Sequence, residues 1–576
     1  MTITLMIRQS FLPATALLLI SSLFNVTAQA IDLPDGFIDE AFVGELGSDV
    51  VSFDASAQAR LFVAEKSGIV RVVFNGFLQP EPFIDISDIV NDRVDRGLLS
   101  LAVHPQFPQV PYIYVLYTYD PPELLDGSLT GAAALDGNGN RVARLARYTA
   151  DETRDFNVAL AGSEEIILGK NSTFETIGNP EGQFDTTMPS CGPIGTPIVD
   201  CLPADEVTHT IGSLRFAADG SLFVTNGDGA NYRSTSPLSQ MTYDLNSMRG
   251  KLLRIDPDTG LGLPDNPFYD GDPASNRSRV ASYGLRNPYS MSVNPVSGVP
   301  YVGEVGEETW EEINAGIGHN FGWPCYEGGS EGTLRQPDFE VEPFCQEVYL
   351  ANEPVEPPLI SWSHDGSGNA VILGDFYFGE AFPEEFNGTL FFGDLIKGWL
   401  RYADVSEPGN VVVKDFATNM QAMVEMRTGV DGALYYASFG SGEIRRIRFA
   451  GNRGDAGAET DTETETDTGS DTDSGSDTDT GSETDTGSDT GSGSGADSGS
   501  EADTGAEADT GSETETSNED ELNAGGLNPP ANDDQQSEPS TVNVGGQLAI
   551  WSCLYLAGFF LLRRSLTKPR SRRNIR

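Results

Sequence analysis

Four histidines occur in the chain, and His209 has the sequence surroundings of a general base. It stands just before the apolar phrase Leu214–Gly229, and Asp228 lies at the far end of the same phrase. A carboxylate beside an imidazole fixes its tautomer and raises its basicity, as proton abstraction requires. A packed structural histidine is the alternative. A catalytic pair requires a hairpin that brings both residues to one end.

A second concentration of polar residues lies between Tyr283 and Gly328. It joins the pair Arg286-Asn287, a group of glutamates and the turn Gly322–Pro324, all beside apolar stretches. Loops held by a rigid scaffold are where binding and catalytic groups gather, so this passage is a candidate site. Taken alone, the glutamates also fit a solvated acidic turn.

The elements that must position these groups are β-hairpins. Apolar runs alternate with turns such as Asp219-Gly220 and Asp431-Gly432, and amphipathic helical patterns are nearly absent. Asp-Gly between β-rich runs indicates a hairpin. Repetition of such hairpins over residues 31–453 predicts an all-β, six-bladed β-propeller, with a β-sandwich array as the alternative. In a propeller, the return strand would bring Asp228 back to the end where His209 lies.

The N-terminus and the cysteines predict export. Residues 1–30 contain one Arg, an apolar core and a final Ala-Gln-Ala, which is the pattern of a cleaved signal peptide. A first transmembrane helix is the alternative. One of five cysteines lies in the C-terminal apolar run, and in an oxidising compartment the other four predict two disulfides. Of three connectivities, the local pairing Cys191–Cys201 and Cys325–Cys345 is the simplest. The sequence has no CxxC spacing, so we do not expect a metal site at these cysteines.

The C-terminal part divides into a spacer and a tail. Residues 454–544 form a low-complexity Asp/Thr/Gly/Ser-rich segment without Lys or Arg, in a chain of net charge −52. With few apolar residues it is predicted to be a disordered linker, and its charge argues against nucleic-acid binding. Residues 545–576 combine Gly-Gly, a short apolar run and a basic end. This tail resembles bacterial sorting signals cleaved by an intramembrane protease; a permanent membrane anchor is the alternative.

Six phrases, in order along the chain, resemble the glucose/sorbosone dehydrogenase family. They are GLLSLAVHPQF (97–107), HTIGSLRFAADGSLFVTNGDG (209–229), RGKLLRIDPDTG (249–260), YGLRNPYSMSVNP (283–295), EVGEETWEEIN (304–314) and NFGWPCYEG (320–328). The resemblance covers about residues 33–448. It implies a six-bladed propeller that oxidises an aldose-type sugar with pyrroloquinoline quinone and calcium as cofactors.

The resemblance also implies roles for particular residues. His209 falls on the family's general base, and Asp228 falls on the carboxylate that orients it. In that chemistry the base removes the proton of the sugar C1 hydroxyl while a hydride passes to the quinone. Arg286 and Asn287 match the pair that contacts the quinone, an anionic planar group that suits bidentate hydrogen bonds from arginine.

The phrase EVGEETWEEIN matches the calcium loop of the family. Gly306 and Glu307 would supply backbone oxygens, and Glu311 would supply a side-chain carboxylate, since Ca²⁺ prefers an oxygen cage. The ion would act as a Lewis acid on a quinone carbonyl. Lys397 matches a further lysine that contacts the quinone, and Trp362 matches an aromatic wall of the cofactor site.

The chain departs from the family pattern in several places. Asp95 and Arg96 stand where the soluble glucose enzymes have a Gln before Gly-Leu-Leu, and Thr208 replaces an Asp before the base. Val305 replaces a polar residue of the calcium loop, and 421–429 lacks two arginines that clamp the quinone. Neither glucose specificity nor quinone affinity therefore follows from the resemblance.

Two insertions carry the four cysteines, Asn171–Glu206 before His209 and Cys325–Pro354 after the Gly-Trp-Pro turn. We expect both to rise around the cofactor face as disulfide-stiffened walls. Such walls would select a substrate larger than free glucose or restrict access to the site.

Together these features predict an exported quinoprotein oxidoreductase, periplasmic, secreted or at the cell surface. It would oxidise an aldose-type sugar at C1 and pass electrons to an acceptor in the cell envelope. The alternative is a non-catalytic propeller on an acidic stalk that binds a glycan or a protein. The candidate base and quinone contacts favour the enzyme, and the unmatched clamp residues favour the binding protein.

Overall fold

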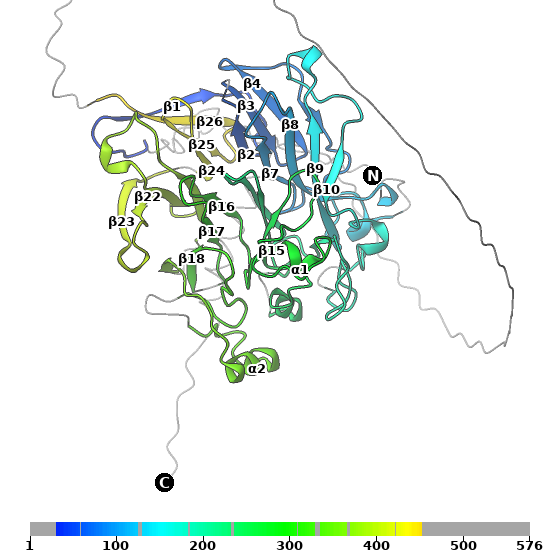
Figure 1. Ribbon diagram of the computed structural model, residues 1–576. Coiled ribbons are helices and arrows are strands. Elements are labelled where there is room, and N and C mark those ends of the chain that lie inside the picture. The colour runs from blue at the N-terminus through cyan, green and yellow to red at the C-terminus, as the bar shows by residue number, and fades with distance from the viewer. Residues whose placement is uncertain are drawn as a thin grey trace, which may run out of the picture. The chain divides into compact units, whose positions relative to one another are not determined.

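The computed structural model describes residues 30–451, apart from 58, 125–128, 183–184, 232–234, 308, 329–333, 366–368 and 421. These residues fold into six antiparallel sheets of four or five strands (Figure 1). The predicted all-β, six-bladed propeller is confirmed. Helices are few and short; α1 (Asn276–Arg279) and α2 (Pro343–Ala351) are the two α-helices of the described residues.

Each blade is built from consecutive strands. Blade 1 contains β2 (Val50–Ala55), β3 (Arg60–Glu65), β4 (Ile69–Phe74), β5 (Phe77–Leu78) and β6 (Ile84–Asp85), and blade 2 contains β7 (Leu98–Val103), β8 (Tyr112–Tyr119), β9 (Arg141–Thr149), β10 (Glu165–Leu168) and β11 (Leu202–Ala204). Blade 3 contains β12 (Ile211–Phe216), β13 (Leu222–Asn226), β14 (Lys251–Ile255) and β15 (Val280–Tyr283), and blade 4 contains β16 (Ser290–Val293), β17 (Pro300–Glu304), β18 (Trp310–Ala315) and β19 (Ile360–Ser363).

Blade 5 follows the same plan, and blade 6 combines the last three strands with the first strand of the ring. Blade 5 contains β20 (Val371–Phe376), β21 (Leu390–Asp394), β22 (Trp399–Asp404) and β23 (Val412–Ala417), and blade 6 contains β24 (Met423–Thr428), β25 (Leu434–Ser438), β26 (Glu443–Phe449) and β1 (Phe37–Val43). Short 3-10 turns in the connections are η1 (Pro122–Leu124), η2 (Gly131–Ala133), η3 (Glu152–Arg154), η4 (Phe174–Thr176), η5 (Pro237–Thr242), η6 (Glu384–Phe386) and η7 (Pro408–Asn410).

The ring closes by pairing its first strand with its last. β1 runs antiparallel to β26, with Phe37 opposite Phe449, so blue and yellow strands share one sheet in Figure 1. The innermost strands, β2, β7, β12, β16, β20 and β24, each contact the next around the axis. Closure of this kind leaves the blades with short, protected edges and fixes the inner strands relative to one another.

Turn chemistry and apolar packing explain why these segments form blades. Asp219-Gly220 lies between β12 and β13, where Gly220 has φ 86°, and Asp431-Gly432 lies between β24 and β25. Both predicted hairpins are therefore confirmed. Between blades, side chains such as Leu98 of β7 and Ile113 of β8 are fully buried. Each buried aliphatic side chain of this size stabilises the fold by about 1.5–3 kcal/mol.

Strand direction decides which loops can form a site. In each four-stranded blade, the loop before the inner strand and the loop between the second and third strands emerge at the same end, because neighbouring strands are antiparallel. We call this end of the propeller the site end. It carries the predicted site residues that lie in such loops: His209, Asp228, Arg286, Asn287, Gly306, Glu307 and Lys397.

Both predicted disulfides are present. Cys191 and Cys201 have Cα atoms 5.4 Å apart, and those of Cys325 and Cys345 are 5.2 Å apart. The predicted signal peptide up to residue 29, the acidic linker at 454–544 and the tail at 545–576 lie outside the described residues. Among the helices that the structure describes, none has the length and apolar character of a membrane span.

Candidate functional site

His209 and Asp228 meet at the site end of blade 3. His209 precedes β12 and Asp228 follows β13, and these strands pair with Ile211 opposite Asn226. The Nδ1 atom of His209 lies 3.2 Å from Oδ1 of Asp228. His209 is 5% exposed and Asp228 is fully buried. The structure thus brings together the two residues predicted as base and orienting carboxylate.

The backbone of the two loops holds this pair close. His209 adopts φ 49°, and its carbonyl oxygen accepts a hydrogen bond of 2.9 Å from Gly229 N–H. Gly227 passes so near that a Cβ atom there would lie 2.3 Å from the His209 carbonyl oxygen. Glycine at 227 is therefore required for the close approach of the two loops.

The Asp228 carboxylate is surrounded by donors. Its Oδ1 also accepts from Ala230 N–H at 2.8 Å, and its Oδ2 accepts from Ser239 Oγ–H and Trp323 Nε1–H, both at 2.8 Å. Burial alone would raise the pKa of Asp228, but the hydrogen bond from His209 and its other contacts hold it below its ordinary value.

The ionised carboxylate decides the tautomer of His209. Because Asp228 can only accept, Nδ1 of His209 carries the proton and Nε2 carries the lone pair. The described part of the chain offers Nε2 no hydrogen-bond partner. The imidazole is therefore held in the form that can take a proton from a ligand.

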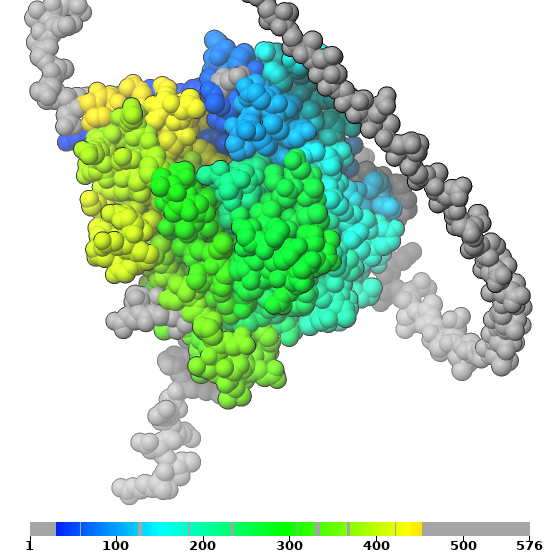
Figure 2. All heavy atoms as spheres, viewed as in Figure 1, coloured from blue at the N-terminus to red at the C-terminus, as the bar shows by residue number. Residues whose placement is uncertain are grey.

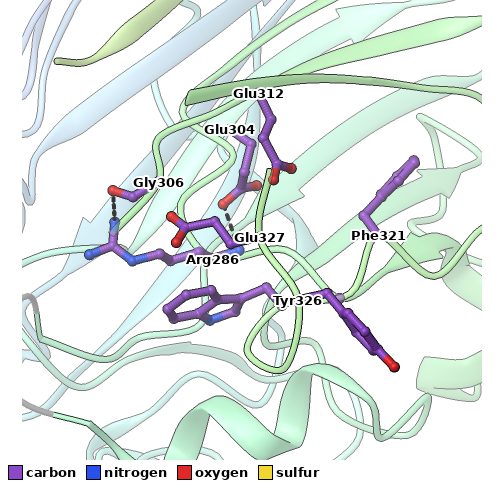
Figure 3. Close-up of a pocket in the computed structure, with 9 residues that line it drawn as sticks. Arg286, Glu304, Gly306, Glu312, Phe321, Tyr326 and Glu327 are labelled. Carbon is purple, nitrogen blue, oxygen red and sulfur yellow. Dashed lines mark hydrogen bonds between the residues drawn. The ribbon is translucent and has the colours of Figure 1, made fainter. Parts of the chain in front are cut away.

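The Arg286 guanidinium lies beside this pair and points into the protein. It donates to the Glu307 carboxylate from Nε at 2.8 Å and from Nη2 at 2.7 Å, and from Nη1 to the carbonyl oxygens of Val305 at 3.0 Å and Gly306 at 2.8 Å. Figure 3 shows the bond to Gly306. Its carbon Cζ lies 5.4 Å from the centre of the Trp323 ring. Arg286 therefore links the loop after β17 to Trp323, whose indole N–H binds Asp228.

Buried glutamates, Glu304, Glu312 and Glu327, surround the other side of Arg286; we call them the glutamate cluster. Together with Arg286 and Trp323 they line a cavity of about 10 Å³, roughly the space of one water (Figure 3). Burial raises the pKa of Glu312 and of Glu327 to about 7, and that of Glu304 well above its ordinary value. Glu312 and Glu327 therefore titrate close to neutral pH.

Donors to the glutamate cluster are few. Glu304 Oε1 accepts the backbone N–H groups of Arg286 at 2.7 Å and Asn287 at 2.6 Å, whereas Oε2, which is buried, has no partner among the described residues. Glu327 accepts from the N–H of Glu307 at 2.5 Å and from the Thr309 hydroxyl at 2.8 Å. An unpartnered buried carboxylate oxygen favours the neutral acid at Glu304.

The three predicted calcium ligands are not brought together. Glu311 Oε1 lies 2.8 Å from His364 Nε2, and its Oε2 accepts from Val371 N–H at 2.8 Å. The carbonyl oxygen of Gly306 and the side-chain carboxylate of Glu307, by contrast, bind Arg286. Within the described ranges, no group of three or more His, Cys, Asp or Glu side chains is arranged to hold a metal ion. Calcium binding by these residues stays a prediction, and the predicted side-chain ligand Glu311 binds His364 and Val371 instead.

Lys397 and Trp362 lie together where blades 4 and 5 meet. Lys397 forms an ion pair with Asp365, and the Trp362 ring packs against Trp399, with ring centres 5.3 Å apart, and against Phe392 at 5.8 Å. The buried Nε1–H of Trp362 has no partner among the described residues. An aromatic wall with an unused donor, next to a lysine, fits a planar ligand rich in acceptor atoms.

Sequence reasoning missed several groups of the site. Ser239, in η5, had no signal because its bond to Asp228 depends on tertiary packing. Trp323 was predicted only as part of a turn, whereas its indole N–H binds Asp228. Glu304 and Glu312 lie on either side of the predicted calcium ligands at 306–311, so their position in an apolar strand pattern could have indicated buried carboxylates.

The chain matches the sequence profile of one family, described as glucose/sorbosone dehydrogenase, over residues 50–179 and 197–446, which is more than half of the chain. It is 30% identical to the aldose sugar dehydrogenase of Escherichia coli over 245 residues, 42% of this chain and 60% of that protein. It is 24% identical to the Hedgehog-interacting protein of Homo sapiens over 246 residues, 41% of this chain and 28% of that protein. The matches thus cover less than two thirds of either relative.

Solved structures show the same architecture. The apo-form of the soluble aldose sugar dehydrogenase from Escherichia coli superposes with a TM-score of 0.50 at 20% identity, covering 72% of this chain and 99% of that chain. A glucose dehydrogenase superposes with a TM-score of 0.51 at 22% identity, covering 71% and 98%. At such identities the likeness supports the fold.

Proposed function

The chain belongs to the glucose/sorbosone dehydrogenase family, and we propose that it is an exported oxidoreductase that oxidises an aldose-type sugar at C1 with pyrroloquinoline quinone. The observation that carries the proposal is the His209–Asp228 pair, with Nδ1 and Oδ1 3.2 Å apart. Two disulfides, Cys191–Cys201 and Cys325–Cys345, support folding in an oxidising compartment outside the cytoplasm.

The proposed proton step belongs to His209. Its Nε2 lone pair takes the proton of the sugar C1 hydroxyl, and the resulting imidazolium is stabilised by the Asp228 carboxylate on Nδ1. Asp228 does not itself become protonated, because its four hydrogen-bond contacts hold it in the ionised form. General-base assistance of this kind contributes about 10²–10⁴ in rate.

The cofactor would be held by residues of blades 4 and 5. When bound, pyrroloquinoline quinone would accept the hydride that leaves C1. Trp362 offers a flat ring and an unused N–H donor, and Lys397 offers a positive charge. Asn287, half-buried beside Arg286, completes the predicted contacts. The mechanism assigns no step to calcium, because the Gly306 carbonyl binds Arg286 and the Glu311 carboxylate binds His364 and Val371.

A second candidate function is a binding propeller without catalysis, held at the cell surface by the acidic linker. Two observations favour it. The predicted quinone contacts Arg286 and Lys397 are both paired with carboxylates, those of Glu307 and Asp365. In addition, one relative is described as a Hedgehog-interacting protein. A glycan or protein would then occupy the same end of the ring.

The test is activity of the full-length protein after incubation with pyrroloquinoline quinone. Reduction of an artificial electron acceptor is measured over a panel of aldoses. We expect turnover with at least one aldose, and a loss of about 10²-fold or more in His209→Asn. Asn is the substitute of choice because it tolerates the positive φ of residue 209.

Two results would reject the dehydrogenase. One is the absence of turnover with every aldose, together with no change in quinone absorbance on mixing. The other is full activity in His209→Asn, which would reject the assigned base. Binding of glycans on an array without added quinone, combined with the first result, would support the binding propeller.

A further inference from the structure

The Asp228 carboxylate has two oxygens, and they face different parts of the protein. Oδ1 contacts His209 and Ala230, within the same hairpin loops. Oδ2 is bound entirely from outside that hairpin, by Ser239 Oγ–H and by Trp323 Nε1–H. The orientation of the carboxylate, and through it of the imidazole, therefore depends on these two external donors.

Trp323 is itself fixed on several sides. Its backbone N–H donates to the Gly284 carbonyl at 2.9 Å, and its carbonyl accepts from the Thr242 hydroxyl at 2.7 Å. Its ring packs edge-on against Phe339, with ring centres 5.1 Å apart, and the residue is 5% exposed. Thr242 and Ser239 both belong to η5, so one short segment holds both donors to Oδ2.

The described residues 334–345 pack beside Trp323. Both cysteines and Phe339 form one apolar cluster with the indole, and the Tyr349 hydroxyl donates to the Cys325 carbonyl at 2.7 Å. In Figure 2 the part of the chain that carries α2 stands out from the body of the propeller. The disulfide links Cys345, in the first turn of α2, to Cys325, which follows Pro324.

We propose that Trp323 and Ser239 are positioning residues for the His209–Asp228 pair, and that the segment closed by Cys325–Cys345 serves as the support of Trp323. This gives that segment a role in alignment, where the sequence led us to expect a wall that selects substrates by size. The role in turnover rests on the proposed function; the role in holding His209 does not.

The physical argument concerns where the negative charge of Asp228 lies. Two donors on Oδ2 draw charge away from Oδ1 and stop the carboxylate from rotating. Removing one donor lets the carboxylate rotate, so the Nδ1–H tautomer of His209 is held less strictly. It also loosens the imidazole, so a base that must face its substrate loses rate while binding is retained.

The experiment compares Trp323→Phe and Ser239→Ala with the unaltered full-length protein. Trp310→Phe is the matched control, because it removes an indole N–H that does not contact Asp228. The ring nitrogens of the four histidines are followed by NMR as pH is varied, and His209→Asn identifies the signals of residue 209. We expect both variants, but not the control, to shift the ring-nitrogen signals of His209 away from those of a pure Nδ1–H tautomer.

Turnover provides the second readout. We expect kcat to fall about tenfold in each variant with little change in KM, since the contact acts through the base. Cys325→Ala/Cys345→Ala should shift the ring-nitrogen signals of His209 in the same direction by a smaller amount. If Trp323→Phe does not fold, Ser239→Ala alone tests whether the donors to Oδ2 position the His209–Asp228 pair.

The outcomes separate this inference from the proposed function. Shifted His209 ring-nitrogen signals without turnover of any aldose would uphold the positioning contact and reject the dehydrogenase. Turnover with unchanged His209 signals and unchanged kcat in Ser239→Ala would overturn the inference and leave the dehydrogenase standing. Unchanged His209 ring-nitrogen signals in Cys325→Ala/Cys345→Ala would overturn the supporting role of the segment closed by Cys325–Cys345.

Discussion

Two acidic regions lie on either side of Arg286, both deeply buried but differing in their hydrogen-bond donors. Asp228 accepts from His209, Ala230, Ser239 and Trp323. In the glutamate cluster, the buried Oε2 of Glu304 has no partner among the described residues. The difference shows that burial alone does not set the charge of a carboxylate.

The donors decide the outcome in each region. Hydrogen bonds to the ionised form overcome the cost of burial at Asp228 and keep its pKa low. Burial dominates at Glu312 and Glu327, whose pKa rises to about 7. One region is therefore a permanently charged support for a base, and the other changes its protonation near neutral pH.

Asp228→Asn should have the largest effect. The amide cannot accept at both former oxygen positions, so its NH₂ group must face either the donor Trp323 or the His209 side. In the second case it favours the tautomer of His209 that has no lone pair on Nε2. We expect kcat to fall about 10³-fold, as in other base–carboxylate pairs, measured with the aldose that gives the highest turnover.

The fold should survive this change, because the amide has nearly the same shape as the carboxylate. Circular dichroism and the cooperative unfolding transition serve as controls. Wild-type kcat in Asp228→Asn, with the tautomer of His209 unchanged by NMR, would show that the donors around Asp228 serve stability rather than the base.

Arg286→Met tests the boundary between the two regions. It removes the buried cation that binds Glu307 and leaves that carboxylate uncompensated. We expect the free energy of unfolding to fall by about 3–4 kcal/mol at pH 8, measured by urea denaturation. In Arg286→Met/Glu307→Gln most of the loss should be recovered. Equal stability of the single and double variants would contradict a buried ion pair.

Loss of each disulfide should affect stability differently with pH, because only Cys325–Cys345 lies near the glutamate cluster in sequence. Their sequence separations are 10 and 20, so loss of either should cost about 3 kcal/mol by the loop-entropy account. Trp323 and Glu327 flank Cys325, whereas no residue of the glutamate cluster lies near Cys191 in sequence. We therefore expect the free energy of unfolding to change less with pH in Cys325→Ala/Cys345→Ala than in the unaltered protein. Cys191→Ala/Cys201→Ala should keep the original change with pH. Identical pH profiles in both variants would refute this.

Glu327→Gln should have the smallest effect, visible as a change with pH. The folded pKa of Glu327 is about 7, above the ordinary value of 4.5, so the folded state binds more protons between these values. Stability should therefore fall as pH rises from about 4.5 to 7 and level off above. The amide removes this contribution, which we expect to be about 2 kcal/mol after allowing for repulsion from Glu312.

The measurement is urea denaturation at pH 5 and pH 8. Glutamine retains the local bonds, since its carbonyl can accept from Glu307 N–H and its NH₂ can donate to the Thr309 hydroxyl. Glu380→Gln, at an exposed position, is the matched control. A stability difference between the two pH values that is the same in Glu327→Gln and in the control would rule out titration at Glu327.

Local sequence predicted the parts of this arrangement that depend on neighbours along the chain. The Asp-Gly turns lie where expected, and the two disulfides join the cysteines nearest in sequence. The pairing of His209 with Asp228 also followed from one hairpin. Such contacts need only the geometry of a turn and two antiparallel strands.

Glu311 shows where local reasoning failed to assemble a site. It was grouped with Gly306 and Glu307 because their phrase resembles the calcium loop of the family. In β18, however, successive side chains point to opposite faces of the sheet. Glu311 therefore reaches His364 and Val371, while Glu312 binds Gly328 on the other face.

The sequence by itself determined the hairpins, the repeat that closes into six blades, and hence which loops share the site end. Only the tertiary structure decided which charges meet there. Trp323 reaches Asp228 across 95 residues of sequence, and Arg286 turns to Glu307 rather than to open solvent. The reason is physical: periodicity and turns fix each blade locally, whereas contacts between loops depend on how neighbouring blades pack around the axis.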